Sequence, residues 1–278
     1  MSLWGIASFF NPSHSRRRTH NLNRWFEGMR TQGLRLILNP EAGGSVCWQK
    51  ERLLNAALKA LPPDCDKVAW LDTDILFLND GWVAEAERLL DQYPLIQLFD
   101  TVVSDGKSST GIVVHHERTK AKEGRTVREI GNPINTMFGR TGYAWAARRE
   151  ILDYCGFYDK CIVGGGDAVM AFAAYGLAWP GENEASDRFT PEHLADIAAW
   201  RDKFYARVQG NVGFVPGTIL HMDHGSQEGR AYETRTEILT RNHFTPDDVT
   251  ESGGPWLWAT DKPQLHSEVA AYFEGRAD

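Results

Sequence analysis

Two aspartates with one residue between them stand directly after a short apolar run. Residues 68–71 (Val-Ala-Trp-Leu) are continuously apolar, and Asp72-Thr73-Asp74 follows them without a gap. Such a run is typical of a central strand covered on both faces, and open α/β sheets bind ligands at the carboxyl ends of their strands. Asp72 and Asp74 can there bind a divalent cation that also holds phosphate oxygens. An Asp that caps a turn beside a solvated Asp is the alternative interpretation.

The run Gly164-Gly165-Gly166-Asp167 is a second candidate for chemistry. Glycines allow a ligand to approach the backbone closely, which makes Gly165 and Gly166 candidate substrate contacts. Asp167 could accept a proton from an attacking hydroxyl as a general base. Asp is also among the best N-cap residues, so the capping of the following helix is the competing interpretation.

Histidines and arginines gather further along, at His221-Met222-Asp223-His224 and then at Arg230. An imidazole at a strand end can complete the shell of a metal that carboxylates hold, and arginines suit phosphates. A hydrogen-bonded structural role is the alternative for either histidine. Trp145 is the tryptophan that we expect to stack on a sugar, although most tryptophans are core residues.

Strands and helices must alternate around these residues. Apolar runs predict strands at 3–10, 34–38, 68–71 and 95–99, with helices at 21–30, 50–61 and 82–90 between them. In residues 50–61 the apolar side chains share one helical face, and Arg52 and Asn55 lie together on another. The second half predicts loops at 104–132, a strand running into a helix at 142–154, helices at 167–175 and 191–208, a strand at 212–222 and a closing helix at 230–241. The pattern indicates an α/β fold with a mixed, mostly parallel central sheet flanked by helices.

The bulk composition narrows the class of protein. The chain has 278 residues, 42% of them hydrophobic, and a net charge of −7, which argues against binding to a nucleic-acid backbone. The sequence has no run of 18 apolar residues, so we expect no transmembrane helix. Its first residues do not have the pattern of a signal peptide. Four cysteines without a Cys-x-x-Cys pair favour reduced thiols and a cytoplasmic location. Peripheral contact with a membrane stays possible.

The order of these motifs resembles that of inverting glycosyltransferases with the GT-A fold, of a family-two-like kind. A helix with Lys50, Arg52 and Asn55 precedes the Asp-x-Asp strand, as in the nucleotide-binding half of those enzymes. Residues 142–145 (Gly-Tyr-Ala-Trp) and 156–159 (Gly-Phe-Tyr-Asp) lead into the glycine run, as on the acceptor side of β-1,4-galactosyltransferases and polypeptide N-acetylgalactosaminyltransferases. Residues 221–235 resemble the His-Gly…Arg-x-Tyr-x-x-Arg tail of bacterial relatives.

The resemblance implies a nucleoside-diphosphate-sugar donor, usually a UDP-sugar, a glycan or other hydroxyl acceptor, and Mn²⁺ or Mg²⁺ as cofactor. By position it implies that Asp72, Asp74 and His224 hold the metal, with His221 second to His224, and that Asp167 is the base. Those families have adjacent Glu and Asp in the glycine-rich loop. Here Gly166 replaces the Glu, so the acceptor contact of that side chain is lost.

The resulting hypothesis is a single GT-A-like catalytic domain that spans residues 1–278. Residues 1–103 would bind the nucleotide-sugar, residues 104–245 the acceptor, and residues 246–278 would form a C-terminal tail. Arg52, Asn55 and Asp72 would contact the nucleotide, with Arg230 near phosphate, and Trp145, Gly165, Gly166 and His221 would contact substrate. The alternatives are a sugar nucleotidyltransferase and an inactive carbohydrate-binding relative.

Overall fold

The computed structural model describes residues 2–11, 14–40, 47, 49–104, 106–114, 139–178, 188–223, 228–231, 234–251 and 254–276. Its larger sheet has the strand order β2 (Arg35–Pro40), β1 (Leu3–Phe9), β3 (Lys67–Leu71), β8 (Ala144–Arg148), β5 (Leu95–Gln97), β9 (Val212–Phe214). All pairs are parallel except those of β8, which is antiparallel to both of its neighbours. The mixed, mostly parallel α/β sheet predicted from the sequence is therefore confirmed.

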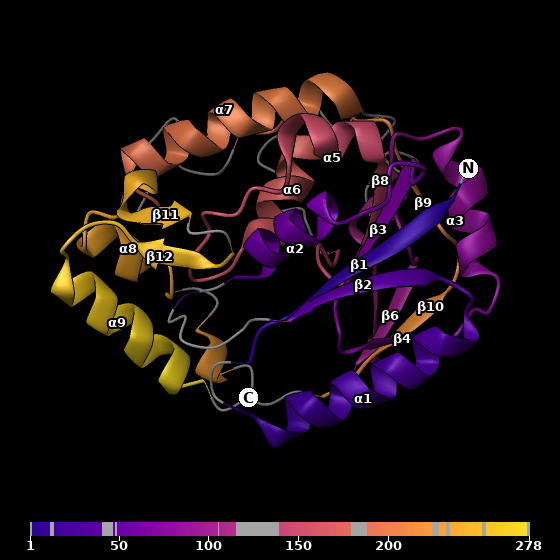
Figure 1. Ribbon diagram of the computed structural model, residues 1–278, viewed down its shortest axis with the longest axis horizontal. Helices are drawn as coiled ribbons and strands as arrows, with labels where there is room; N and C mark the ends of the chain where they lie inside the picture. Colours follow the sequence, from indigo (N-terminus) through magenta and orange to yellow (C-terminus); the bar gives the residue numbers. More distant parts are fainter. Residues whose placement is uncertain are drawn as a thin grey trace.

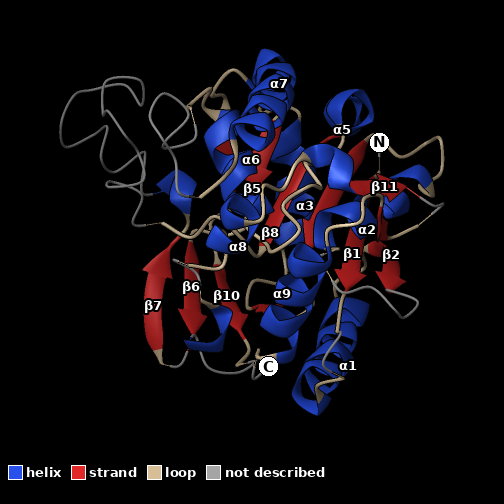
Figure 2. Ribbon diagram, turned by 90° about the vertical axis from the view of Figure 1, so that its left-hand side faces the viewer, coloured by secondary structure: helices blue, strands red, loops and turns tan. Residues whose placement is uncertain are grey.

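A second sheet meets the larger one next to the Asp-x-Asp triplet. Its order is β4 (Ile75–Phe77), β10 (Thr218–His221), β6 (Thr101–Ser104), β7 (Lys107–Thr110), and a separate hairpin pairs β11 (Val249–Glu251) with β12 (Trp256–Trp258). Figure 2 shows β7, β6 and β10 side by side below the larger sheet. Because β4 begins directly after Asp74 and pairs with β10, the triplet lies where the two sheets meet.

Helices cover both faces of the larger sheet. On one side lies α1 (Arg16–Thr31), and on the other lie α5 (Arg149–Cys155), α6 (Gly166–Ala174) and α7 (Pro191–Val208), as Figure 1 shows. Residues of β3 alternate between the two faces: Val68 and Trp70 pack with α2 (Lys50–Lys59), whereas Ala69 and Leu71 pack with α1 and α3 (Trp82–Leu90). This two-sided burial explains why the sequence of β3 is continuously apolar.

A third apolar cluster holds the C-terminal part of the chain against α6 and α7. It contains Val169 and Phe172 of α6, Leu194 of α7, Leu239 of α8 (Glu237–Arg241) and Phe273 of α9 (Pro263–Glu274). The 3₁₀ helices η2 (Glu228–Arg230) and η3 (Pro246–Asp248) lie in the same part of the chain. The C-terminal residues are thereby fixed beside the glycine-rich turn that begins α6.

The structure differs from the predicted elements in the second half. Residues 212–222 form two strands, β9 and β10, in different sheets, because Pro216 and Gly217 interrupt the run and Gly217 has φ of +150°. The predicted closing helix at 230–241 is a 3₁₀ turn and the short α8. Of the predicted loop at 104–132, residues 107–110 form β7 instead, and residues 105 and 115–132 lie outside the described part of the chain. Helix α7 begins at Pro191 as predicted, and Thr190 caps it by accepting from the backbone N–H of His193 at 3.3 Å.

Candidate active site

A cavity of about 340 Å³ opens where β1, β3 and β10 end. Asp72 and Asp74 line one wall, with His221 at the end of β10, and Asp167 of α6 lines an adjoining wall. Gly142 closes the space between the walls, since a Cβ there would lie 3.2 Å from Oδ2 of Asp167 and 3.9 Å from Oδ2 of Asp72. The fold thus brings the predicted metal-binding acids and the predicted base into one cavity.

One lysine joins the two walls. The Nζ of Lys50, the first residue of α2, lies 2.7 Å from Oδ1 of Asp72 and 2.9 and 3.0 Å from the two carboxylate oxygens of Asp167. Burial opposes the charge of Lys50, but the carboxylates of Asp167 and Asp72 raise its pKa well above the usual value. The ammonium therefore stays protonated at neutral pH. Its positive charge offsets the charges of two acids, one directly after β3 and one in the first turn of α6.

The carboxylate of Asp72 is held on both of its oxygens. Besides the ion pair at Oδ1, Oδ2 accepts the backbone N–H of Tyr143 at 3.2 Å, and the backbone N–H of Asp72 donates to the carbonyl of Tyr143 at 2.8 Å. Burial raises the pKa of Asp72 to about 6, and Lys50 opposes that rise. These contacts fix the orientation of the Asp72 carboxyl group at the strand end. Because its pKa is raised toward neutral pH, a cation bound beside it would favour the charged form.

Asp74 and His221 face each other across the junction of the two sheets. The backbone N–H of Met222 donates to the carbonyl of Asp74 at 2.8 Å, which continues the β4–β10 pairing. Nε2 of His221 lies 3.8 Å from Oδ2 of Asp74, and its Nδ1 lies 3.1 Å from the hydroxyl of Ser104. A hydrogen bond on Nδ1 fixes the ring and directs Nε2 to the carboxylate.

The donor types at this junction fit a divalent metal. Carboxylate and imidazole are ligands that Mn²⁺ accepts, and carboxylate also suits Mg²⁺. Asp74 supplies a carboxylate and His221 an imidazole, and Asp72 stands two residues before Asp74 on the chain. Within the described residues no group of three such side chains is already arranged around one point. His224, the third predicted ligand, lies outside the described part of the chain.

Asp167 does not cap its helix. Gly165, in a left-handed conformation with φ of +113°, is the N-cap residue of α6, and no side chain caps that end. Asp167 is the second residue of the helix, and its carboxylate points at Lys50. The N-cap interpretation is therefore wrong. The glycines serve the turn itself, because Gly164 has φ of +93° and a Cβ on it would lie 3.1 Å from a guanidinium nitrogen of Arg235.

Arginines from separate parts of the chain converge on the same cavity. Arg230 of η2 and Arg276 beyond α9 are 9% and 4% exposed, and Arg18 of α1 and Arg235 are half-buried. Tyr272 of α9 donates to the carbonyl of Arg230 at 3.1 Å, which ties η2 to the C-terminal helix. Guanidinium groups bind phosphate oxygens through paired hydrogen bonds. Arg230 and Arg235, both part of the motif singled out in the sequence, thus line this cavity together with Arg18, Arg140 and Arg276, and the role of Arg230 near phosphate stays a prediction.

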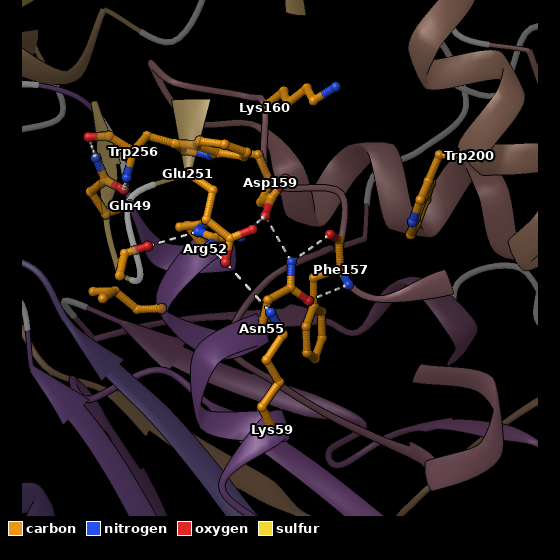
Figure 3. Close-up of polar contacts among 12 residues, drawn as sticks. Gln49, Arg52, Asn55, Lys59, Phe157, Asp159, Lys160, Trp200, Glu251 and Trp256 are labelled. Carbon is orange, nitrogen blue, oxygen red and sulfur yellow. Dashed lines mark hydrogen bonds and ion pairs between the residues drawn. The ribbon is translucent and has the colours of Figure 1, made fainter. Parts of the chain in front are cut away.

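Arg52 and Asn55 do not line this cavity. Figure 3 shows both side chains pointing from α2 toward residues 157–159 and the β11–β12 hairpin. Arg52 pairs with Glu251, donates to the carbonyl of Gly254 at 2.8 Å and lies over the ring of Trp256 at 4.7 Å. Asn55 exchanges hydrogen bonds with the backbone of Phe157 at 2.8 and 3.0 Å. Their prediction as nucleotide contacts is corrected by the structure, because these contacts use the polar groups of both residues.

Two other predicted substrate contacts lie away from the main cavity. Trp145 is fully buried in β8, where its Nε1–H donates to the carbonyl of Thr141 at 2.9 Å and its ring packs in the sheet core. It cannot stack on a sugar in this position, which corrects that prediction. Gly166 lines a smaller adjoining cavity of about 10 Å³, whereas Gly165 lines the main one.

Lys50 and Glu51 are site residues that the sequence reasoning missed. Both are buried, at 9% and 6% exposure, in the first turn of α2. The signal was present, because Lys50 stands four, seven and eleven residues before Leu54, Ala57 and Leu61 and so lies on the apolar face of the helix. A charged residue on that face is rarely buried unless it is paired.

Comparisons with known proteins return only distant likenesses. No family model and no curated protein matches the sequence. Among solved structures the chain is similar to the Drosophila β1,4-galactosyltransferase 7 catalytic domain with xylobiose, at 16% identity and a TM-score of 0.37. That likeness covers 61% of this chain and 59% of the other, so this chain spans less than two thirds of it.

Two further structures are alike over most of this chain. M. tuberculosis glucosyl-3-phosphoglycerate synthase matches 93% of this chain and 88% of its own, at 11% identity and a TM-score of 0.39. A glycosyltransferase involved in glycosylation of the PBCV-1 major capsid matches over 87% of this chain and 100% of its own, at 12% identity and a TM-score of 0.39. Likenesses of this size do not establish a shared activity. Within the described residues no helix is long and apolar enough to cross a membrane.

Proposed function

We propose that this protein is a glycosyltransferase that moves a sugar from a nucleoside-diphosphate-sugar to an acceptor hydroxyl. The observation that carries the proposal is one cavity lined by Asp74, His221 and Asp167, in which Lys50 contacts both Asp72 and Asp167. A donor needs cations near its diphosphate, and an attacking hydroxyl needs a base on the opposite side. Both kinds of group line one space of a size suited to small molecules.

On the donor side, Asp74, His221 and His224 would hold Mn²⁺ or Mg²⁺, together with Asp72. A bound metal of this kind neutralises charge that develops on a diphosphate leaving group. Arg230 and Arg235 supply guanidinium groups at the same cavity, and UDP is the nucleotide that the sequence resemblance favours. Residues 1–103 and the C-terminal tail both contribute to this space, the tail through Arg276.

On the acceptor side, Asp167 would accept the proton of the acceptor hydroxyl as its oxygen attacks the anomeric carbon. The bond from that carbon to the diphosphate oxygen breaks, and the nucleoside diphosphate leaves with the electron pair. If the anomeric carbon of the donor is held between Asp167 and the diphosphate, the attack would be in line and the anomeric configuration would invert. The ammonium of Lys50, which donates to both carboxylate oxygens of Asp167, would hold that side chain in position at the cavity.

A ligand-dependent melting experiment tests the donor side. Wild-type protein is melted with UDP, UDP-galactose, UDP-glucose, UDP-N-acetylglucosamine or GDP-mannose, each with and without Mn²⁺. A ligand at 100 times its Kd should stabilise the fold by about 2.7 kcal/mol. Stabilisation by one nucleotide class, greater with Mn²⁺ and reduced in Asp74→Ala, is the expected result. If no nucleotide shifts the melting temperature, the proposed function fails.

Turnover tests the acceptor side and separates the alternatives. Asp167→Asn should lower the rate of UDP release by about 10²- to 10⁴-fold while nucleotide binding persists, and retention of configuration in the product would eliminate Asp167 as base. Release of pyrophosphate from a nucleoside triphosphate and a sugar phosphate would indicate a nucleotidyltransferase instead. Binding of glycans without nucleotide, metal or turnover would indicate a carbohydrate-binding protein.

A further inference from the structure

The carboxyl group of Glu51 occupies the space that a side chain at position 166 would fill. Glu51 is in the first turn of α2, and Gly166 is the first residue of α6. A Cβ on Gly166 would lie 2.5 Å from Oε1 and 2.6 Å from Cδ of Glu51, closer than real Cβ contacts come. Two helices that are far apart in the chain therefore place a second carboxyl group next to Asp167.

Glu51 faces ligand space rather than bulk solvent. Like Asp167, it lines both the main cavity and the adjoining one, whose other walls are mostly apolar rings such as Trp70 and Phe157. An acidic residue in the first turn of a helix is favourable when it is exposed, because of the helix dipole. That effect does not require burial to 6% exposure beside other acids. The position of Glu51 is therefore not explained by the stability of α2.

The environment of Glu51 favours its protonated form. Burial raises its pKa to about 8, Lys50 opposes the rise, and the carboxylates of Asp167 and Asp72 add to it. A protonated carboxyl has one O–H to donate. Glu51 in that form supplies a hydrogen-bond donor in the same cavity as the carboxyl oxygens of Asp167.

We propose that Glu51 and Asp167 together bind an acceptor through two adjacent hydroxyl groups. Glu51 donates a hydrogen bond to one hydroxyl, and Asp167 accepts the proton of the neighbouring hydroxyl, which is the one that attacks. The acceptor class is then a saccharide or polyol with a vicinal diol. This assignment rests on the proposed function and adds to it the residue that orients the acceptor.

The geometry of position 166 allows a reciprocal exchange as the test. Glu51→Ala removes the carboxyl group, and the double variant Glu51→Ala with Gly166→Glu returns one from the other helix. Gly166 is not among the residues with positive φ, so its backbone accepts a side chain once Glu51 is truncated. Glu51→Gln keeps an N–H donor in the original place. Glu150→Ala, an exposed acid in the first turn of α5, is the matched control.

The assay is release of UDP from the three UDP-sugars named above, or of GDP from GDP-mannose. The acceptors are methyl glycosides of xylose, glucose and galactose, and 1,3-propanediol as an acceptor without adjacent hydroxyls. Glu51→Ala should raise KM for the glycoside by about 10- to 100-fold, the loss expected for one hydrogen bond to a buried polar group, with a much smaller effect on KM for the donor. Glu51→Gln and the double variant should recover most of that loss, and Glu150→Ala should behave as wild type.

Three results would overturn the assignment. Equal losses in donor KM and glycoside KM on Glu51→Ala would show a structural role. An unchanged KM for the glycoside would show that Glu51 does not contact the acceptor. Use of 1,3-propanediol by the wild type as readily as the glycosides would exclude recognition of a vicinal diol. Failure of the wild type to release UDP from every donor, with or without acceptor, contradicts the proposed function itself and is thereby distinguishable from a failure of the Glu51 assignment.

Discussion

Replacement of Lys50 by Met tests whether one ammonium holds the two walls of the cavity together. Met has a similar length and keeps the apolar stem, so the change removes mainly the charge. Asp72 and Asp167 would then face each other without the cation that lies 2.7 and 2.9 Å from them. Removing one partner of a buried pair costs about 3–5 kcal/mol. The side chains of Asp72 and Asp167 are 24% and 31% exposed, so we expect the lower end, about 3 kcal/mol.

The expected shift is measurable. At about 2–4 °C per kcal/mol for a chain of this size, Lys50→Met should melt about 6–12 °C below wild type at pH 7. The matched control is Lys59→Met, at the other end of the same helix, where the side chain is 69% exposed. That variant should melt within about 4 °C of wild type, because surface pairs contribute about 0–1 kcal/mol.

The pH dependence has a definite sign. The folded-state pKa of Asp72 is raised to about 6 from 3.8, and that of Glu51 to about 8 from 4.5. A raised pKa means that the folded state holds the proton more tightly, so stability from these groups is present at low pH and is lost as pH rises through about 6 and 8. Loss of Lys50 raises both pKa values further, so the deficit of Lys50→Met should grow from pH 5 to pH 8. Melting followed by circular dichroism at four pH values measures it. A deficit that is absent, or the same at every pH, refutes the reasoning.

Three further predictions concern residues around the cavity. Arg52→Ala should lower the free energy of unfolding by about 1–3 kcal/mol in chemical denaturation, while UDP stabilises the variant as much as wild type; a selective loss of UDP binding would restore Arg52 to the nucleotide site. His221→Ala should weaken Mn²⁺ at least about tenfold in calorimetry, and unchanged affinity would exclude it as a ligand. Gly164→Ala should cost about 1–2 kcal/mol of backbone strain and also displace Arg235, with a fall in kcat that Gly106→Ala, which has similar φ but open space around it, should not show.

Much of the first half of the fold follows from the sequence because its elements are local. The apolar runs of β1 and β3 and the face of α2 are each set by neighbours within a dozen residues. Strand β8 is different, because it inserts between β3 and β5 and is antiparallel to both. These pairings join residues 73–81 and 48–52 positions apart in the sequence, which periodicity does not encode. The helix Pro263–Glu274 escaped prediction although Pro263 marks its first turn.

The site was predictable where a residue ends a strand and unpredictable where it depends on which helices meet. Asp72 and Asp74 end a buried strand, so their common edge follows from topology. Arg52 and Asn55 share one helical face, and that pattern was read correctly. What lies against that face, residues 157–159 and the β11–β12 hairpin, is a tertiary fact that the spacing does not contain. For the same reason Lys50, on another face of the same helix, was overlooked as a site residue.

Residues on different faces of helix α2 contact different parts of the structure. Arg52 and Asn55 fasten it to residues 157–159, the segment that leads into the glycine turn and α6. Lys50 and Glu51 then reach, from one turn of the same helix, to Asp72 on the proposed donor side and to Asp167 and Gly166 on the proposed acceptor side. Buried acids at this density reduce the stability of a fold, since each raised pKa is free energy lost at neutral pH. Because Arg52 and Asn55 hold α2 against the segment that leads into α6, a change at either residue should lower the transfer rate, through a changed position of Asp167, and leave nucleotide affinity intact.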